Sequence, residues 1–225
     1  MNPQLSHITQ SSVPVSKKVR KTSKGNTPLT FTDIYEESVN LAYWQRSLSI
    51  ELNNAVAALL KSTSHSQIAL TTSSKQVTSH LIEHLQLKAD SPLITDINEL
   101  VDMFCCLFSL RQVALRLVIL TKPMCPKFHV DRVPCRLITT YQEAATEWLP
   151  HASVNRSKLG AGAEGAEDHE SGLYNHSSDI QQLNIGDVAL LKGELWENND
   201  NAGLVHRSPK SQNQQNRLLL TLDFA

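Results

Sequence analysis

The sequence CPKFHVDRVPCRLITTY occupies residues 125–141 and carries two local signals. Its second half, residues 135–141, is rich in β-branched and apolar side chains, which predicts a β-strand. Its first half contains His129 and Asp131, two residues apart. Because residues i and i+2 of an extended chain lie on the same side, this imidazole and this carboxylate can approach one ion together.

Further strands are predicted on both sides of this stretch. Residues 113–119 alternate in character, residues 188–191 form an apolar run after a turn, and residues 217–224 form another apolar run. Short strands separated by loops, without alternating helices, are typical of a β-sandwich or a double-stranded β-helix. A doubly wound α/β sheet is therefore disfavoured.

The part of the chain before these strands has helical spacing. Residues 34–48 and 52–60 place apolar side chains three and four positions apart, which predicts two helices, or one helix broken near residues 47–49. Another helix is predicted over residues 75–87. A last one is expected to start at Asp96, a favourable N-cap residue, and to end near residue 110.

These elements predict an α+β protein in which a mostly helical N-terminal half packs on a C-terminal double-stranded β-helix, a jelly-roll or cupin-like core. We expect residues 1–30, which are rich in Ser, Thr, Pro and Lys, to be a disordered tail. Residues 31–225 are expected to form a single domain, helical over 31–110 and β-rich over 111–225. The glycines and acids of residues 154–178 predict a flexible insertion.

Composition excludes several functions. The 225 residues carry 21 basic and 22 acidic side chains, a net charge of −1, which gives no overall attraction to nucleic acid. The longest apolar stretch, residues 104–120, is interrupted by Arg111 and Arg116, so no membrane span is expected. The four cysteines form no CxxC motif and no secretory signal precedes them, which favours reduced thiols and a cytoplasmic location.

His206, just before the last predicted strand, is the candidate third ligand to an ion held by His129 and Asp131. Two histidines and one carboxylate form the set that holds ferrous iron while leaving coordination positions open. Arg217 follows eleven positions (217 − 206) after His206. Its forked guanidinium is suited to grip a carboxylate in the same cavity.

The order His129, Asp131, His206 and then Arg217 resembles that of the iron(II)- and 2-oxoglutarate-dependent oxygenases, which have a double-stranded β-helix fold. The resemblance covers residues 128–224. It implies that His129, Asp131 and His206 bind Fe(II) and that Arg217 binds the distal carboxylate of 2-oxoglutarate. The activity implied is oxidation of a substrate that the sequence does not identify.

One position departs from the oxygenase pattern. Many of these oxygenases have a hydroxyl residue two positions after the arginine, whereas this chain has Leu219. We therefore expect the hydroxyl partner of the cofactor to come from the neighbouring strand, as Tyr141, Thr139 or Thr140.

Most of the chain past residue 30 also resembles an uncharacterised bacterial family known as domain of unknown function 1826. The matching segments are Trp44-Gln45-Arg46, residues 129–141, Thr146-Glu147-Trp148-Leu149 and Val205-His206-Arg207-Ser208-Pro209. This resemblance implies no established activity.

A second kind of metal site is also compatible with the sequence. Cys125, His129, Cys135 and His206 offer four nitrogen and sulfur ligands, a set that suits tetrahedral zinc. Such a site would belong to a non-catalytic zinc-binding protein linked to metal homeostasis.

Simpler roles remain open for individual residues. His129 and Asp131 can form a hydrogen-bonded pair at a sheet edge, and Arg217 can be a surface cation. Trp148 is expected to pack in the core rather than to cover a site, and Arg136 would bind an anionic substrate if it pointed into the barrel. Without a metal, the chain would be a protein-interaction domain.

Overall fold

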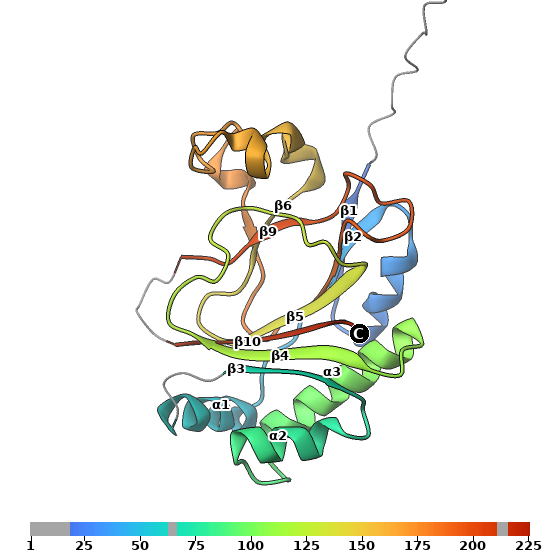
Figure 1. The fold of residues 1–225 in the computed structure, drawn as a ribbon, viewed down its shortest axis with the longest axis vertical. Helices are drawn as coiled ribbons and strands as arrows, with labels where there is room; N and C mark the ends of the chain where they lie inside the picture. The colour runs from blue at the N-terminus through green and yellow to red at the C-terminus, as the bar shows by residue number, and fades with distance from the viewer. Residues whose placement is uncertain (1–18, 63–66, 211–215) are drawn as a thin grey trace, which may run out of the picture.

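The computed structural model describes residues 19–62, 67–210 and 216–225. Its largest element is a seven-stranded sheet with the strand order β1-β2-β8-β5-β10-β4-β3, and a smaller sheet has the order β7-β6-β9 (Figure 1). The strands are β1 (Lys21–Gly25), β2 (Val39–Trp44), β3 (Gln67–Thr72), β4 (Val113–Leu120), β5 (Cys135–Gln142), β6 (Glu147–Leu149), β7 (Gln181–Gln182), β8 (Val188–Lys192), β9 (Val205–Arg207) and β10 (Arg217–Phe224). The α-helices are α1 (Ile50–Ser62), α2 (Val77–Leu85) and α3 (Pro92–Phe108). Short 3-10 helices are η1 (Pro28–Tyr35), η2 (His151–Ser153), η3 (Arg156–Lys158), η4 (Gly160–Ala163) and η5 (Ser177–Asp179).

The two faces of the large sheet have different neighbours. Helices α1, α2 and α3 cover one face, and the three-stranded sheet lies over the other (Figure 1). Along β5, Leu137 packs in the core beneath the helices, whereas Ile138 packs between the sheets with Trp148. This alternation follows from the two-residue period of a strand. Within the described residues, no helix combines the length and apolarity needed to cross a bilayer.

Strand β10 lies inside the large sheet and pairs with two strands. It is antiparallel to β4 along its whole length, from Arg217 opposite Leu120 to Phe224 opposite Val113. Its other edge pairs with β5, with a shift in register between Leu218 and Leu219. The group β1-β2-β8-β5 and the group β4-β3 are therefore joined through β10.

Most of the elements predicted from the sequence are present. Strands β4, β5, β8 and β10 confirm the four predicted strands, and α1, α2 and α3 confirm the helices predicted at residues 52–60, 75–87 and 96–110. The helix predicted over residues 34–48 is wrong, since residues 39–44 form β2. The first four residues of β2 are all buried, so apolar side chains occur on both faces and the alternation typical of a half-buried strand is lost.

Asp96 is not an N-cap residue, because α3 begins at Pro92, after Ser91. Asp96 instead lies inside α3 and is buried. It accepts hydrogen bonds from Arg46 (Nη1 to Oδ1, 2.5 Å; Nη2 to Oδ2, 3.0 Å) and from the hydroxyl of Tyr141 (2.7 Å). This network fastens α3 to β5.

The predicted boundary of the N-terminal tail at residue 30 is also wrong. Residues 21–25 form β1, which pairs in parallel with β2, and residues 28–35 form η1. Residues 1–18 lie outside the described residues. Because β1, β2 and β3 lie in the same sheet as the later strands, helical and β-rich parts are interleaved in space rather than divided at residue 110.

The predicted insertion at residues 154–178 contains defined local structure. Three 3-10 helices, η3, η4 and η5, begin within it, and its side chains Val154 and Leu173 are buried. Together with η2, it forms the lobe beyond the three-stranded sheet in Figure 1. Its mobility stays a prediction.

Candidate metal centre

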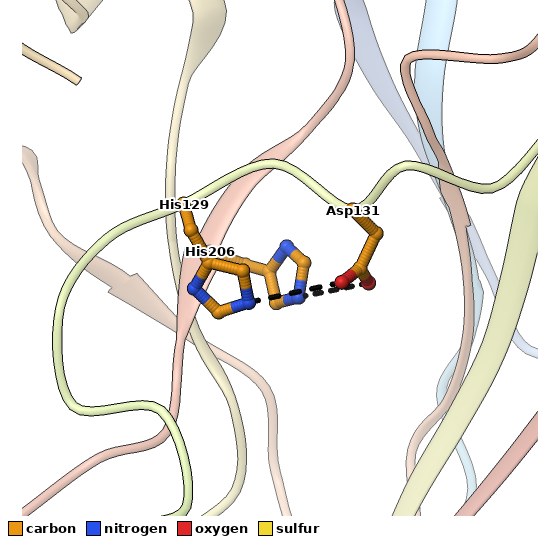
Figure 2. A group of neighbouring side chains, drawn as sticks. All are labelled: His129, Asp131 and His206. Carbon is orange, nitrogen blue, oxygen red and sulfur yellow. Dashed lines mark ion pairs between the residues drawn. The ribbon is translucent and has the colours of Figure 1, made fainter. Parts of the chain in front are cut away.

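Three predicted ligands meet at one point (Figure 2). His129, on the connection between β4 and β5, forms an antiparallel bridge with His206 of β9, and the two backbone hydrogen bonds of this bridge are both 3.0 Å long. Asp131 Oδ2 is 3.3 Å from His206 Nε2, and Asp131 Oδ1 is 3.8 Å from His129 Nε2. The three candidate ligand atoms lie within 4.8 Å of one another.

The backbone fixes the orientation of both imidazole rings. Nδ1 of His129 lies 2.9 Å from the carbonyl of Lys127, and Nδ1 of His206 lies 3.2 Å from the carbonyl of Leu204. Since a carbonyl only accepts hydrogen bonds, each Nδ1 carries the hydrogen. Each Nε2 is thereby directed toward Asp131, the arrangement in which metal-binding histidines are held by a second partner.

The electrostatics favour the metal-binding protonation states of Asp131 and His129. Burial would raise the pKa of Asp131, but the hydrogen bond from His206 and the charges of His206 and Arg136 hold it well below its usual range. Burial, followed by the nearby charge of His206, lowers the pKa of His129. At neutral pH, Asp131 is therefore a carboxylate and His129 a neutral imidazole, the forms that donate to a cation.

Arg136 positions Asp131. Its Nη1 donates to Asp131 Oδ2 (2.8 Å), while Nε and Nη2 donate to the two carboxylate oxygens of Asp223 on β10 (2.8 and 2.7 Å). Arg136 is thus engaged by two carboxylates, which does not support its predicted role in binding an anionic substrate. The pairing of Asp223 with Arg136 could not be predicted from the sequence, because the two residues are 87 positions apart.

Arg217 is a buried cation with polar neighbours but no acidic partner among the described residues. Its side chain donates to the hydroxyls of Thr140 (3.0 Å), Thr146 (3.2 Å) and Ser208 (3.4 Å), and its buried Nε has no partner. The residue is 7% exposed, and burial lowers its pKa to about 10. It is therefore not the surface cation considered above. A buried guanidinium with an unused donor is suited to an anionic ligand.

Of the three hydroxyl residues proposed for the cofactor, Thr140 is the one that contacts Arg217. Thr139 lies opposite Leu220 and Val188 on the side of β5 that faces the helices. Tyr141 also points to that side, where its hydroxyl donates to Asp96. The assignment of Thr139 and Tyr141 to the cofactor is corrected accordingly.

Thr146 and Ser208 are site residues that sequence reasoning did not assign to Arg217. Both residues lie in segments that carry the resemblance to the uncharacterised family. Ser208 lies two positions after His206 and, with Thr146, lines the same pocket as both histidines. In the sequence, only the closeness of Ser208 to His206 and of Thr146 to β6 could have marked them as site residues. Their contact with Arg217 depends on the packing of separate strands.

The four-ligand zinc set is not assembled. Cys135 is fully buried in the core beneath the helices, and burial raises the pKa of its thiol. Cys125 is exposed and lines the pocket beside His129 and His206, but it is not part of the ligand group formed with Asp131.

The fold is similar to that of solved dioxygenases. The dioxygenase for auxin oxidation 1 from Arabidopsis thaliana, solved as a binary complex with 2-oxoglutarate, has a TM-score of 0.52 at 10% sequence identity, with 92% of each chain covered. The dioxygenase for auxin oxidation in rice has a TM-score of 0.53 at 10% identity, covering 91% of this chain and 82% of that chain. The chain thus shares its fold with these two dioxygenases.

The chain belongs to the family described as "Protein of unknown function (DUF1826)", whose model matches residues 25–223. Both resemblances noted in the sequence are confirmed at the level of family and fold. No curated protein matches the chain.

Proposed function

We propose that this protein is an iron(II)- and 2-oxoglutarate-dependent oxygenase whose two sheets form a double-stranded β-helix. His129, Asp131 and His206 would hold the metal. Arg217, assisted by Thr140, would bind the distal carboxylate of 2-oxoglutarate. Bound iron would supply the redox chemistry that couples decarboxylation of the keto acid to oxidation of a substrate by O₂.

The observation that carries this proposal is the burial of the Arg217 guanidinium beside the pocket of the candidate ligands. A metal-ligand group alone is compatible with many functions. Here, however, a buried guanidinium with no acidic partner in the described part of the chain donates to Thr146 and Ser208, and these two hydroxyl residues line the pocket of His129 and His206. An incoming carboxylate would neutralise that charge and satisfy its unused Nε donor.

The chain's own residues have defined tasks in this scheme. The carbonyls behind His129 and His206 hold both rings with Nε2 toward the metal position. Arg136 keeps Asp131 ionised and oriented. The apolar side chains Ile138 and Leu219 line the same pocket and limit the access of water.

The test is anaerobic addition of ferrous iron and then 2-oxoglutarate to the purified protein. Chelation of iron by the keto acid should produce a weak visible charge-transfer band, which His206→Ala should abolish. His84→Ala is the matched control, because His84 is an exposed histidine on α2 and should leave the band unchanged. Absence of the band in the wild-type protein would refute the proposal.

A zinc-binding protein would give a different result. It would stay colourless, retain one tightly bound zinc ion, and lose that ion on Cys125→Ser. Since Cys125 is outside the ligand group, we expect Cys125→Ser to have little effect on the metal.

A further inference from the structure

The lobe formed by residues 150–180 packs against the segments that carry both histidines. Its residues Val154 and Leu173 share an apolar cluster with Phe128 and Val205. Phe128 and Val205 immediately precede His129 and His206 in the chain. The lobe thus supports the backbone of both metal-binding residues, although it supplies none of the three ligands.

Asp168 makes the polar contact between this lobe and the same two segments. One carboxylate oxygen, Oδ2, accepts a hydrogen bond from the backbone N–H of Phe128 (3.0 Å) and another from Nη1 of Arg207 (3.1 Å). Phe128 and Arg207 are direct chain neighbours of His129 and His206. Asp168 is 9% exposed, so both bonds are shielded from water.

Arg207 extends this contact to strand β6. Its Nε donates to Glu147 on β6 (2.6 Å), and its guanidinium lies 4.2 Å from the centroid of the Phe128 ring. The ion pairs of Arg207 with Asp168 and Glu147 therefore link the lobe, β9 and β6. Loss of Asp168 would leave Arg207 with one carboxylate and the N–H of Phe128 with no acceptor.

We propose that Asp168 is a positioning residue of the metal centre, through which the lobe of residues 150–180 sets the metal affinity of His129 and His206. This inference rests on the proposed metal site and adds a device that controls it. The geometric reason is that one carboxylate from outside the site holds the two histidine-bearing segments at their observed separation. Partners that orient metal ligands typically contribute 10- to 100-fold to metal affinity.

The test is titration of the metal-free full chain with Co²⁺, followed by its visible d–d absorption. Asp168→Asn keeps an oxygen that can accept from Phe128 but removes the charge facing Arg207. We expect it to weaken Co²⁺ binding roughly tenfold. Glu164→Gln, an exposed acid in the same lobe, should bind Co²⁺ like the wild type.

The outcomes separate the two proposals. Wild-type affinity in Asp168→Asn would overturn the positioning role while leaving the proposed metal site intact. Failure of the wild-type protein itself to bind Co²⁺ would overturn both. If Asp168→Asn does not fold, Arg207→Lys replaces it, because a lysine cannot bridge Glu147 and Asp168 with one planar fork; unchanged binding there would also overturn the inference.

A second readout distinguishes positioning from a purely structural contact. Coupling is reciprocal, so Co²⁺ should slow hydrogen exchange of amides in residues 154–173 of the wild-type protein. The slowing should vanish in Asp168→Asn, although the lobe contains no ligand. Exchange in this lobe that does not respond to Co²⁺ in the wild type would overturn the inference.

Discussion

Replacing Arg217 with methionine should weaken 2-oxoglutarate binding strongly while changing the stability of the ligand-free protein little. Burial lowers the pKa of Arg217 from its ordinary value of 12.5 to about 10, which corresponds to about 3 kcal/mol against the charged form in the folded state. Its hydrogen bonds to Thr140, Thr146 and Ser208 contribute about 1 kcal/mol each. Removing charge and bonds together should therefore shift the free energy of unfolding by no more than about 1–2 kcal/mol.

The burial penalty on the charge of Arg217 has the same sign at every pH at which the protein would normally be studied. Because the folded-state pKa is below the unfolded-state value, the charged form is penalised in the fold at every pH below about 10. The small stability change in Arg217→Met should thus be the same at pH 6 and pH 8, measured by urea unfolding.

The affinity for 2-oxoglutarate should fall much more than the stability does in Arg217→Met. Loss of a buried charge-assisted contact to a carboxylate costs about 2–4 kcal/mol, which raises the Kd for 2-oxoglutarate by roughly 30- to 1000-fold. Anaerobic titration of the iron-loaded protein, followed by the charge-transfer band, measures this Kd. Unchanged affinity in Arg217→Met would refute the carboxylate assignment, and a loss of more than 3 kcal/mol of stability would refute the claim that Arg217 lacks a compensating anion.

Three further predictions concern neighbouring groups. Thr140→Val should raise the Kd for 2-oxoglutarate by about three- to tenfold, because Thr140 accepts a hydrogen bond from Arg217. Thr139→Val, on the opposite face of β5, should leave this Kd unchanged. Calorimetric titration of the two variants would show the difference. Tyr141→Phe should lower the free energy of unfolding by about 1–2 kcal/mol without affecting that Kd, because its hydroxyl donates to an acid of α3, and urea unfolding tests this. Burial lowers the pKa of Lys192 from 10.5 to about 8, so its charge is penalised in the fold below that pH and the penalty disappears as the pH rises. Relative to Lys192→Met, the free energy of unfolding of the wild-type protein should therefore rise by up to about 3 kcal/mol between pH 8 and pH 10.5. Equal pH profiles of the two proteins in urea unfolding would contradict this.

Local spacing was enough to suggest His129 and Asp131 as members of the candidate metal centre, whereas the bridge between His129 and His206 is a long-range contact. The i, i+2 spacing of His129 and Asp131 puts both side chains on one side of an extended segment, and residues before and within the last strand supplied His206 and Arg217. The choice between Thr140 and its neighbours could not be made in the same way. It depends on which face of β5 looks toward the helices and on the register shift of β10 at Leu218, neither of which the sequence of β5 contains.

Two other features needed long-range information. Residues 39–44 form a strand because β1 and β8 pair with both of its edges, and the run was apolar enough to fit a helical pattern as well. Asp96 has the side chain of a helix cap, but Arg46 and Tyr141 hold it inside α3. In both cases, partners distant in sequence outweighed a local preference.

The position of β10 has a consequence for how this protein is made. Strands β4 and β5 are separated in the sheet by a strand that follows them by more than 70 residues in the chain, so neither can acquire its final neighbour early in synthesis. The same strand brings Arg217 at its start and Asp223 near its end. Until β10 has docked, β4 and β5 therefore each have an unpaired edge, and the molecule lacks both the buried cation Arg217 and the carboxylate of Asp223 that anchors Arg136.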